Sequence, residues 1–241
     1  MVSLADFSKC SGRTAPFRGA VFDFNGTLFW DTPLHIDAWM EYCAIHSVPL
    51  TLEDFYAKVY GKTNEDIFAI LFDGKLSPET VQAEAEVKER MYREICVRKG
   101  QELAPGAEDF LNSLQERGIP FTIATASPLA NVEFFYDYAR LDRWFQFEDL
   151  VWLDGTVVGK PDPAMYLKAM QIIGQKPENV LIFEDSPPGI QAAMASKAGD
   201  VILVNSEERD YSRYPYRVIR DFSEVADLEF YRSADGCTDE T

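Results

Sequence analysis

The chain has 241 residues, of which 46% are hydrophobic and 13% aromatic, so it can build a sizeable core and is not a disordered protein. Its formal net charge at pH 7 is −17. A surface this acidic repels nucleic-acid phosphates and anionic lipid, which excludes both as expected partners. An anion-binding site on such a protein must therefore supply its own positive charge, from a metal ion, lysines or helix N-termini.

The cysteines and the apolar stretches indicate the compartment. The four cysteines, at positions 10, 43, 96 and 237, form neither a CxxC pair nor a metal-ligand spacing, so we expect buried or free thiols in a reducing compartment. The first residues lack the apolar core of a signal peptide, and the uncharged stretch 118–132 is too short and too polar to span a bilayer. We therefore expect a cytoplasmic protein that is not attached to a membrane.

Short apolar runs alternate with helical patterns along much of the chain. The first run, 19–24, is followed at once by the turn sequence NGT, as expected for a buried strand that enters a tight loop. The intervening helical patterns end at Gly118 and Gly174. This alternation predicts a parallel sheet covered by helices on both faces, the α/β class. The later apolar runs are 121–125, 179–183, 201–204 and 216–219.

The region between about 33 and 103 contains helical patterns and no convincing strand. Leu52, Phe55, Tyr56 and Val59 have the spacing of an apolar helical stripe. Further on, Thr63 is placed to cap one helix, and the sequence Ser-Pro-Glu at 77–79 begins another that ends at Gly100. A helical block is therefore inserted after the first strand of the α/β domain.

Polar residues gather at the predicted carboxyl ends of the strands, where open α/β sheets bind their ligands. Lys160, in the sequence GKPDP, precedes the helix that leads into the third strand. The set supplies a nucleophile, hydroxyls, an ammonium group and paired carboxylates, which are the groups needed for metal-assisted phosphoryl transfer. The strand-end residues are Asp23, Asn25, Thr27, Thr125, Ser127, Glu184, Asp185 and Ser186; among them, Ser127 is interpreted as the cap of a helix that begins near Pro128.

Each residue type has a chemical reason to be present. The carboxylate of Asp23 can form an aspartyl-phosphate, which divides one difficult step into two easier ones. Mg²⁺ prefers oxygen ligands, and Asp23, Asp185 and a backbone carbonyl offer a sparse octahedral site for it. Gly26 lets backbone N–H groups approach phosphate oxygens closely. Lys160 and the Thr125 hydroxyl can bind the remaining phosphate oxygens.

Four sequence segments together resemble the motifs of the haloacid dehalogenase superfamily. They are DFNGTLF at 23–29, TAS at 125–127, GKPDP at 159–163 and FEDSPPGIQAA at 183–193. Their order and spacing are most similar to the phosphatase/β-phosphoglucomutase-like branch, and the resemblance extends over 19–204. Four motifs in the right order are far more specific than any one alone.

The resemblance implies a fold and a division into domains. The expected fold is α/β, with a Rossmann-like parallel sheet core and an inserted α-helical cap domain. The core would be discontinuous, formed by 17–32 and 104–225. The cap would occupy 33–103, and 226–241 would be a C-terminal tail. The protein would be a monomer or a weak homodimer.

The resemblance also implies roles for the motif residues. Asp23 would be the nucleophile, and Lys160 would bind the transferred phosphate. The same phosphate would be bound by the residues Gly26, Thr27, Thr125 and Ala126. Mg²⁺ would be held by Asp23, Asp185, the backbone carbonyl of Asn25, and Glu184 either directly or through water.

Asn25 departs from the family pattern, which usually has an aspartate here as general acid/base. An amide can donate a hydrogen bond to a leaving oxygen but cannot deliver a proton to it, and general acid–base help contributes about 10²–10⁴-fold. His35, in the sequence LHIDAW, is one possible substitute acid. Alternatively, the leaving group needs no proton, or the protein is a weak or silent relative. Deamidation of Asn25 before Gly26 is a further hypothesis.

The cap sequence also departs from the mutase pattern. Asn64 and Pro128 occupy positions where the mutases have a phosphate-binding arginine and lysine. The favoured function is therefore a Mg²⁺-dependent hydrolase of small phosphorylated metabolites that acts through Asp23. The alternatives are an inactive phosphate-binding relative, a hydrolase of acyl phosphates, phosphonates or halides, and a β-phosphoglucomutase-like mutase.

Overall fold

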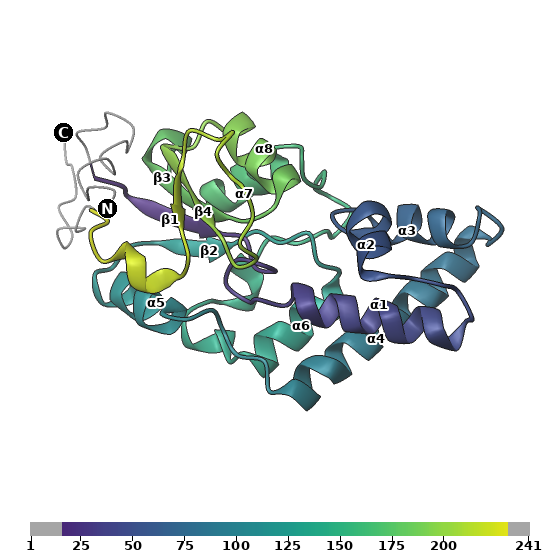
Figure 1. The fold of residues 1–241 in the computed structure, drawn as a ribbon. Helices are drawn as coiled ribbons and strands as arrows, with labels where there is room; N and C mark the ends of the chain where they lie inside the picture. Colours follow the sequence, from purple (N-terminus) through teal and green to yellow (C-terminus); the bar gives the residue numbers. More distant parts are fainter. Residues whose placement is uncertain (1–15, 231–241) are drawn as a thin grey trace, which may run out of the picture. The chain divides into compact units, whose positions relative to one another are not determined.

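A computed structural model of the protein describes residues 16–230 (Figure 1). Most of the predicted C-terminal tail lies outside the described residues, as do Cys10 and Cys237. Cys43 and Cys96 are buried, and neither forms a disulfide among the described residues. The chain divides into two compact units: the segment Trp30–Glu102, which we call the cap unit, and a core unit formed by the described residues before and after it. Within 16–230, none of the helices has the length and hydrophobicity required to cross a bilayer.

The core unit is built on a parallel sheet with strand order β2-β1-β3-β4-β5. Ala20 of the central strand pairs with Phe121 on one side and with Leu181 on the other. Every residue of β1 and of β3 is buried, which explains why both read as continuous apolar runs. The predicted α/β fold with a parallel sheet is confirmed. The strands are β1 (Gly19–Phe22), β2 (Phe121–Ile123), β3 (Val180–Glu184), β4 (Asp200–Val204) and β5 (Arg217–Ile219).

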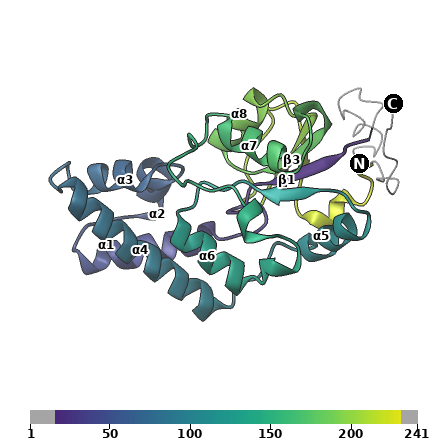
Figure 2. The same cartoon turned by 180° about the vertical axis from the view of Figure 1, so that it is seen from behind.

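Helices cover both faces of this sheet, as Figure 2 shows from behind. On one face, α7 (Ala164–Ile172) and α8 (Pro187–Ala195) pack against the strands in a single apolar cluster. On the other face lies α5 (Ala107–Glu116), and Phe22 stacks on Phe183 at 4.8 Å between ring centroids. The sheet is therefore a buried middle layer, and its polar residues can emerge only at the strand ends.

The loop after β1 is held by a separate helix, α6 (Leu129–Tyr138). The ring of Phe135 lies 4.6 Å from that of Phe24 and 5.6 Å from that of Phe29. This packing fixes the backbone of the loop that carries the candidate nucleophile. Short one-turn segments complete the core unit: η2 (Leu141–Arg143), η3 (Phe147–Asp149), η4 (Pro177–Asn179) and η5 (Phe222–Val225).

The cap unit is helical throughout its regular structure. The long helix α4 begins after the cap residue Ser77 and ends at Gly100, whose φ of 62° is in the left-handed region. Thr63 caps α3, because its hydroxyl accepts a hydrogen bond from the Asp66 N–H at 3.2 Å. These helix ends were predicted from the sequence and are confirmed. The elements are α1 (Thr32–Ile45), α2 (Leu52–Asp54), η1 (Phe55–Val59), α3 (Asn64–Leu71) and α4 (Pro78–Lys99).

The predicted apolar stripe in 52–59 is only partly correct. Phe55 and Val59 are buried, but Leu52 and Tyr56 are 53% and 47% exposed. The reason is that α2 is a single turn, after which the chain continues as the π-helical turn η1, closed by a hydrogen bond from Tyr60 N–H to the Phe55 carbonyl at 2.9 Å. A π-turn is wider than an α-turn, so the α-helical periodicity does not hold there.

Candidate active site

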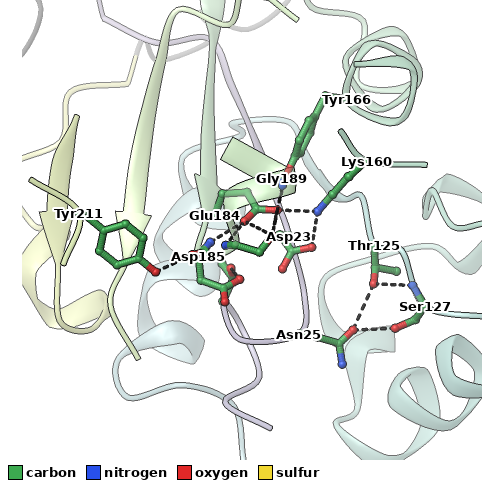
Figure 3. A network of polar contacts seen from close by, with 12 residues as sticks. Asp23, Asn25, Thr125, Ser127, Lys160, Tyr166, Glu184, Asp185, Gly189 and Tyr211 are labelled. Carbon is green, nitrogen blue, oxygen red and sulfur yellow. Dashed lines mark hydrogen bonds and ion pairs between the residues drawn. The ribbon is translucent and has the colours of Figure 1, made fainter. Parts of the chain in front are cut away.

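A buried lysine lies between two carboxylates at the carboxyl ends of β1 and β3 (Figure 3). Asp23 directly follows β1, and its N–H donates to the Phe183 carbonyl at 2.9 Å. Lys160 forms one ion pair with Asp23 Oδ1 and another with Glu184 Oε1 at 2.8 Å. The lysine side chain is only 5% exposed. Three residues from distant parts of the sequence therefore meet as predicted.

Protein donors hold both oxygens of the Glu184 carboxylate. Oε1 accepts from Lys160 and from the Tyr166 hydroxyl at 3.1 Å. Oε2 accepts from the backbone N–H groups of Asp185 and Ser186, both at 2.6 Å. Gly189 in α8 leaves the space for this carboxylate, because a Cβ there would lie 1.5 Å from Oε1. The charge next to Lys160 is thus fixed in place.

Asp185 is buried beside the loop after β1. Its Oδ1 accepts a hydrogen bond from the Thr27 hydroxyl at 3.2 Å. Gly26 has a φ of +79°, and a Cβ there would lie 2.4 Å from Asp185 Oδ2. The Gly26 N–H donates to the Phe29 carbonyl at 2.7 Å. Glycine is therefore needed for the turn and for the close approach of Asp185, and the predicted contact of Gly26 with phosphate stays a prediction.

Asp23, Glu184 and Asp185 form an acidic cluster that can hold a metal ion. Each offers one carboxylate oxygen, and these atoms all lie within 4.8 Å of one another. Burial raises the pKa of Asp23 to about 7. The positive charge of Lys160 lowers this pKa and the negative charge of Glu184 raises it, but burial is the largest effect. Burial, with the charges of Glu184 and Asp23, also raises the pKa of Asp185 well above its ordinary value. Neighbouring carboxylates repel one another when they are all ionised, and a bound cation would remove that repulsion. The three carboxylates therefore fit a hard divalent ion, which prefers oxygen ligands.

Lys160 retains its positive charge in this environment. Burial alone would lower the pKa of the ammonium group, but the charges of Asp23 and Glu184 raise it above its ordinary value. The site therefore contains one fixed cation against three carboxylates. The nearby Arg209 already has a carboxylate partner, because it forms an ion pair with Glu207.

Asn25, Thr125 and Ser127 form a second polar group in the site. The Asn25 amide oxygen accepts from the Ser127 hydroxyl at 2.6 Å and from the Thr125 hydroxyl at 3.2 Å. The interpretation of Ser127 as a helix cap is wrong. Helix α6 has Pro128 at its N-cap position and no side-chain cap, and the Ser127 hydroxyl is instead directed to Asn25.

Two residues after β4 contact the site and were not predicted. The Ser206 hydroxyl donates to the Gly26 carbonyl at 2.9 Å, and the buried hydroxyl of Tyr211 donates to the Asp185 carbonyl. These two hydrogen bonds hold the backbone at Gly26 and at Asp185 in place. Ser206 lies two residues beyond the end of β4. The predicted site draws on polar residues at the carboxyl ends of the earlier strands, and the same search after β4 would have found Ser206. Tyr211 lies farther along an irregular segment, where no sequence signal marks it.

His35 lies in the cap unit, in a buried polar cluster of its own. Its Nδ1 is 3.0 Å from Lys88 Nζ, and since an ammonium group can only donate, Nδ1 is the acceptor. The proton of the neutral ring is then on Nε2, which is 3.5 Å from Asp31 Oδ2. The ring also stacks on Tyr92, with 3.8 Å between centroids. Lys88, 2% exposed and paired with Glu89 at 2.8 Å, was not singled out from the sequence.

The fold and the site define a Rossmann-like α/β protein with an acidic cluster at the ends of β1 and β3. The model of the haloacid dehalogenase-like hydrolase family matches residues 17–197, and the chain belongs to this family.

Named relatives agree with this assignment. The chain is 29% identical over 180 residues to a phosphorylated carbohydrates phosphatase of Thermotoga maritima, covering 73% of this chain and 80% of the relative. It is 28% identical over 189 residues to hexitol phosphatase A of Escherichia coli, covering 78% and 83%. Among solved structures, a family IA variant 3 hydrolase of Entamoeba histolytica is similar, with 33% identity, a TM-score of 0.81 and coverage of 86% and 95%.

Proposed function

We propose that the protein is a Mg²⁺-dependent phosphatase of small phosphorylated metabolites, with Asp23 as the nucleophile. The observation that carries this proposal is the convergence of Asp23, Lys160 and Asp185, in which the nucleophile is paired with the ammonium group and lies within the acidic cluster. The relatives named as phosphatases of carbohydrates and hexitols make sugar and polyol phosphates the first natural substrates to test.

The core unit's own residues account for the proposed reaction. An oxygen of Asp23 attacks phosphorus as the bond to the leaving oxygen breaks, and water then hydrolyses the aspartyl-phosphate. Lys160 holds the ionised Asp23 and faces the phosphoryl oxygens. The Thr125 hydroxyl donates to Asn25 Oδ1 and would have to turn from that amide to donate to a phosphoryl oxygen. Asp23, Asp185 and the backbone carbonyl of Asn25 would hold Mg²⁺, whose positive charge would let two anions approach each other.

Glu184 has a supporting task in this scheme. A direct bond to the metal would displace one of the donors that hold its two oxygens. We therefore assign Glu184 to orienting Lys160 and the start of α8, with any contact to the metal passing through water. His35 has both ring nitrogens engaged within the cap unit, and no proton-transfer role is assigned to it.

Turnover of p-nitrophenyl phosphate with Mg²⁺ tests the function, because that leaving group hardly needs a general acid. Asp23→Asn keeps the size of the side chain and removes the nucleophile, so we expect a loss of about 10³-fold or more. Asp137→Asn, at an exposed position of α6, is the matched control and should retain activity. Wild-type turnover by Asp23→Asn would overturn the proposal. A phosphate adduct on the peptide containing Asp23, found by mass spectrometry after rapid quenching, would support it directly.

The Asn25 amide favours a second candidate, a relative that binds phosphate compounds without turnover. Calorimetry with phosphate and Mg²⁺ would then show binding, while even high protein concentrations release no p-nitrophenol. Asn25→Asp distinguishes the two candidates further. In a phosphatase, it should raise the turnover of poor leaving groups, within the range of about 10²–10⁴-fold that a general acid supplies.

A further inference from the structure

We propose that Ser127 is a positioning residue that fixes the Asn25 amide with its NH₂ group, and not its oxygen, available to the leaving oxygen of the substrate. The inference rests on the proposed function and deepens it, because it defines the substrate class. Figure 3 shows the amide oxygen turned toward Ser127 and Thr125 and the amide nitrogen turned away from them.

The hydrogen-bond distances support this orientation of the amide. The Ser127 hydroxyl oxygen lies 2.6 Å from Asn25 Oδ1, a separation usual for O–H···O bonds and shorter than the range of N–H···O bonds. An amide turned the other way would place its nitrogen in that short contact. The Thr125 hydroxyl already accepts from the Ser127 N–H at 3.2 Å, and it donates its own proton to Asn25 Oδ1.

Asn25 is suitably placed to contact a leaving group. It follows the nucleophile by two residues on the same loop, and in phosphoryl transfer the attacking and leaving oxygens lie on opposite sides of phosphorus. An amide nitrogen that is turned away from the loop after β2 can reach the leaving side. The NH₂ group carries two hydrogens, so a bond from one of them to the protein leaves the other for the substrate.

The chemistry of a fixed amide donor limits the substrate. As the bond between Asp23 oxygen and phosphorus forms, the bond from phosphorus to the leaving oxygen breaks, and the leaving oxygen keeps the electron pair. The amide stabilises that developing charge by a hydrogen bond but transfers no proton, so the leaving group departs as an anion and takes its proton from water. The favoured substrates are phosphate compounds with a stable leaving anion, such as acyl and aryl phosphates. Sugar and polyol phosphates, whose leaving alkoxide is far more basic, should be turned over more slowly.

A double-mutant cycle on Ser127 and Asn25 tests the inference with two aryl phosphates. Ser127→Ala should lower kcat about 10-fold on phenyl phosphate, the effect of one hydrogen bond, and less on p-nitrophenyl phosphate, whose leaving anion needs less help. In the Asn25→Ala background, Ser127→Ala should have no further effect. Ser127→Thr, which keeps the hydroxyl, should restore most of the rate. Ser212→Ala, at an exposed position, is the matched control.

Several outcomes would overturn the inference. Ser127→Ala could leave kcat unchanged, lower it equally on both substrates, or lower it as much without Asn25 as with it. The last two results would mean that Ser127 has only a structural role. Since Asp23→Asn tests the proposed function separately, an inactive Asp23→Asn with an unaffected Ser127→Ala would reject this inference alone.

Discussion

Each unit of the protein has a lysine with a buried side chain beside a glutamate, and the surroundings of these two lysines differ. Lys88 and Glu89 are neighbours on the helix α4, so the pair is formed within one element of the cap unit. Lys160 comes from a loop of the core unit and meets carboxylates carried by the ends of two different strands.

The number of carboxylates around each lysine distinguishes the Lys88–Glu89 pair, which we interpret as structural, from the candidate active site around Lys160. The ammonium of Lys88 has Glu89 as its partner, and Asn64 also donates to that carboxylate at 3.3 Å. The Asp31 carboxylate of the same cluster accepts from the Tyr92 hydroxyl. In the core unit, one ammonium faces three carboxylates, and burial raises the pKa of both Asp23 and Asp185. A buried lysine is therefore a weak indicator of function by itself, whereas excess negative charge beside it indicates a site that can bind a cation.

The largest effect is expected for the Lys88 pair. Lys88→Met leaves Glu89 buried without its ion-pair partner, and we expect a loss of about 3–5 kcal/mol in the free energy of unfolding, measured in urea. Lys75→Met is the control, because its pair with Asp73 is exposed and should contribute about 0–1 kcal/mol. If Lys88→Met lost kcat but kept its stability, the comparison would fail and Lys88 would belong to a functional site.

Lys160 should show its effect in catalysis. Lys160→Met removes the cation that faces Asp23, and we expect kcat/KM on p-nitrophenyl phosphate to fall by about 10²–10³-fold. Lys160→Arg keeps the charge but changes its shape, so its activity should lie between those of Lys160→Met and the wild type. Equal turnover by the wild type and Lys160→Met would remove this lysine from the mechanism.

Tyr211 should affect the metal site through the backbone of Asp185. Tyr211→Phe removes the hydroxyl that donates to the Asp185 carbonyl, and loss of such an outer contact should weaken Mg²⁺ binding about 10-fold. Tyr136→Phe is a matched control, because its hydroxyl makes the same kind of bond to the Phe145 carbonyl at 3.0 Å. Equal Mg²⁺ affinities of the two variants, measured by calorimetry, would contradict this role.

The smallest effect is a change of stability with pH in the metal-free protein. Because the pKa of Asp185 is raised on folding, the folded state binds its proton more tightly, and stability falls as pH rises from 3.8 through the folded value. Asp185→Asn removes this penalty, so at pH 7 in EDTA its Tm should be higher than that of the wild type. The difference should disappear near pH 4. Adding Mg²⁺ should stabilise the wild type more than the variant.

The sequence was sufficient to predict the parallel sheet and the meeting of Asp23, Lys160 and Asp185. Strand ends in a parallel sheet share one edge, so residues that follow different strands meet there whatever their separation in the chain. Side-chain direction is not encoded so simply. The contact of Ser127 with Asn25 and the bond of Tyr211 to the Asp185 carbonyl depend on how irregular segments fold over that edge. Irregular segments have no repeating apolar pattern from which their conformation could be predicted.

Gly189 has a consequence for engineering this protein. In a helix, replacing glycine by alanine ordinarily gains about 1 kcal/mol, so a thermostability screen guided by helix propensity would favour the exchange in α8. Here the new methyl group would occupy the space of the Glu184 carboxylate. Glu184 would have to move, and Lys160 would lose the partner that holds it against Asp23. The exchange would therefore damage the nucleophile's surroundings from a helix position that contributes no chemical group of its own.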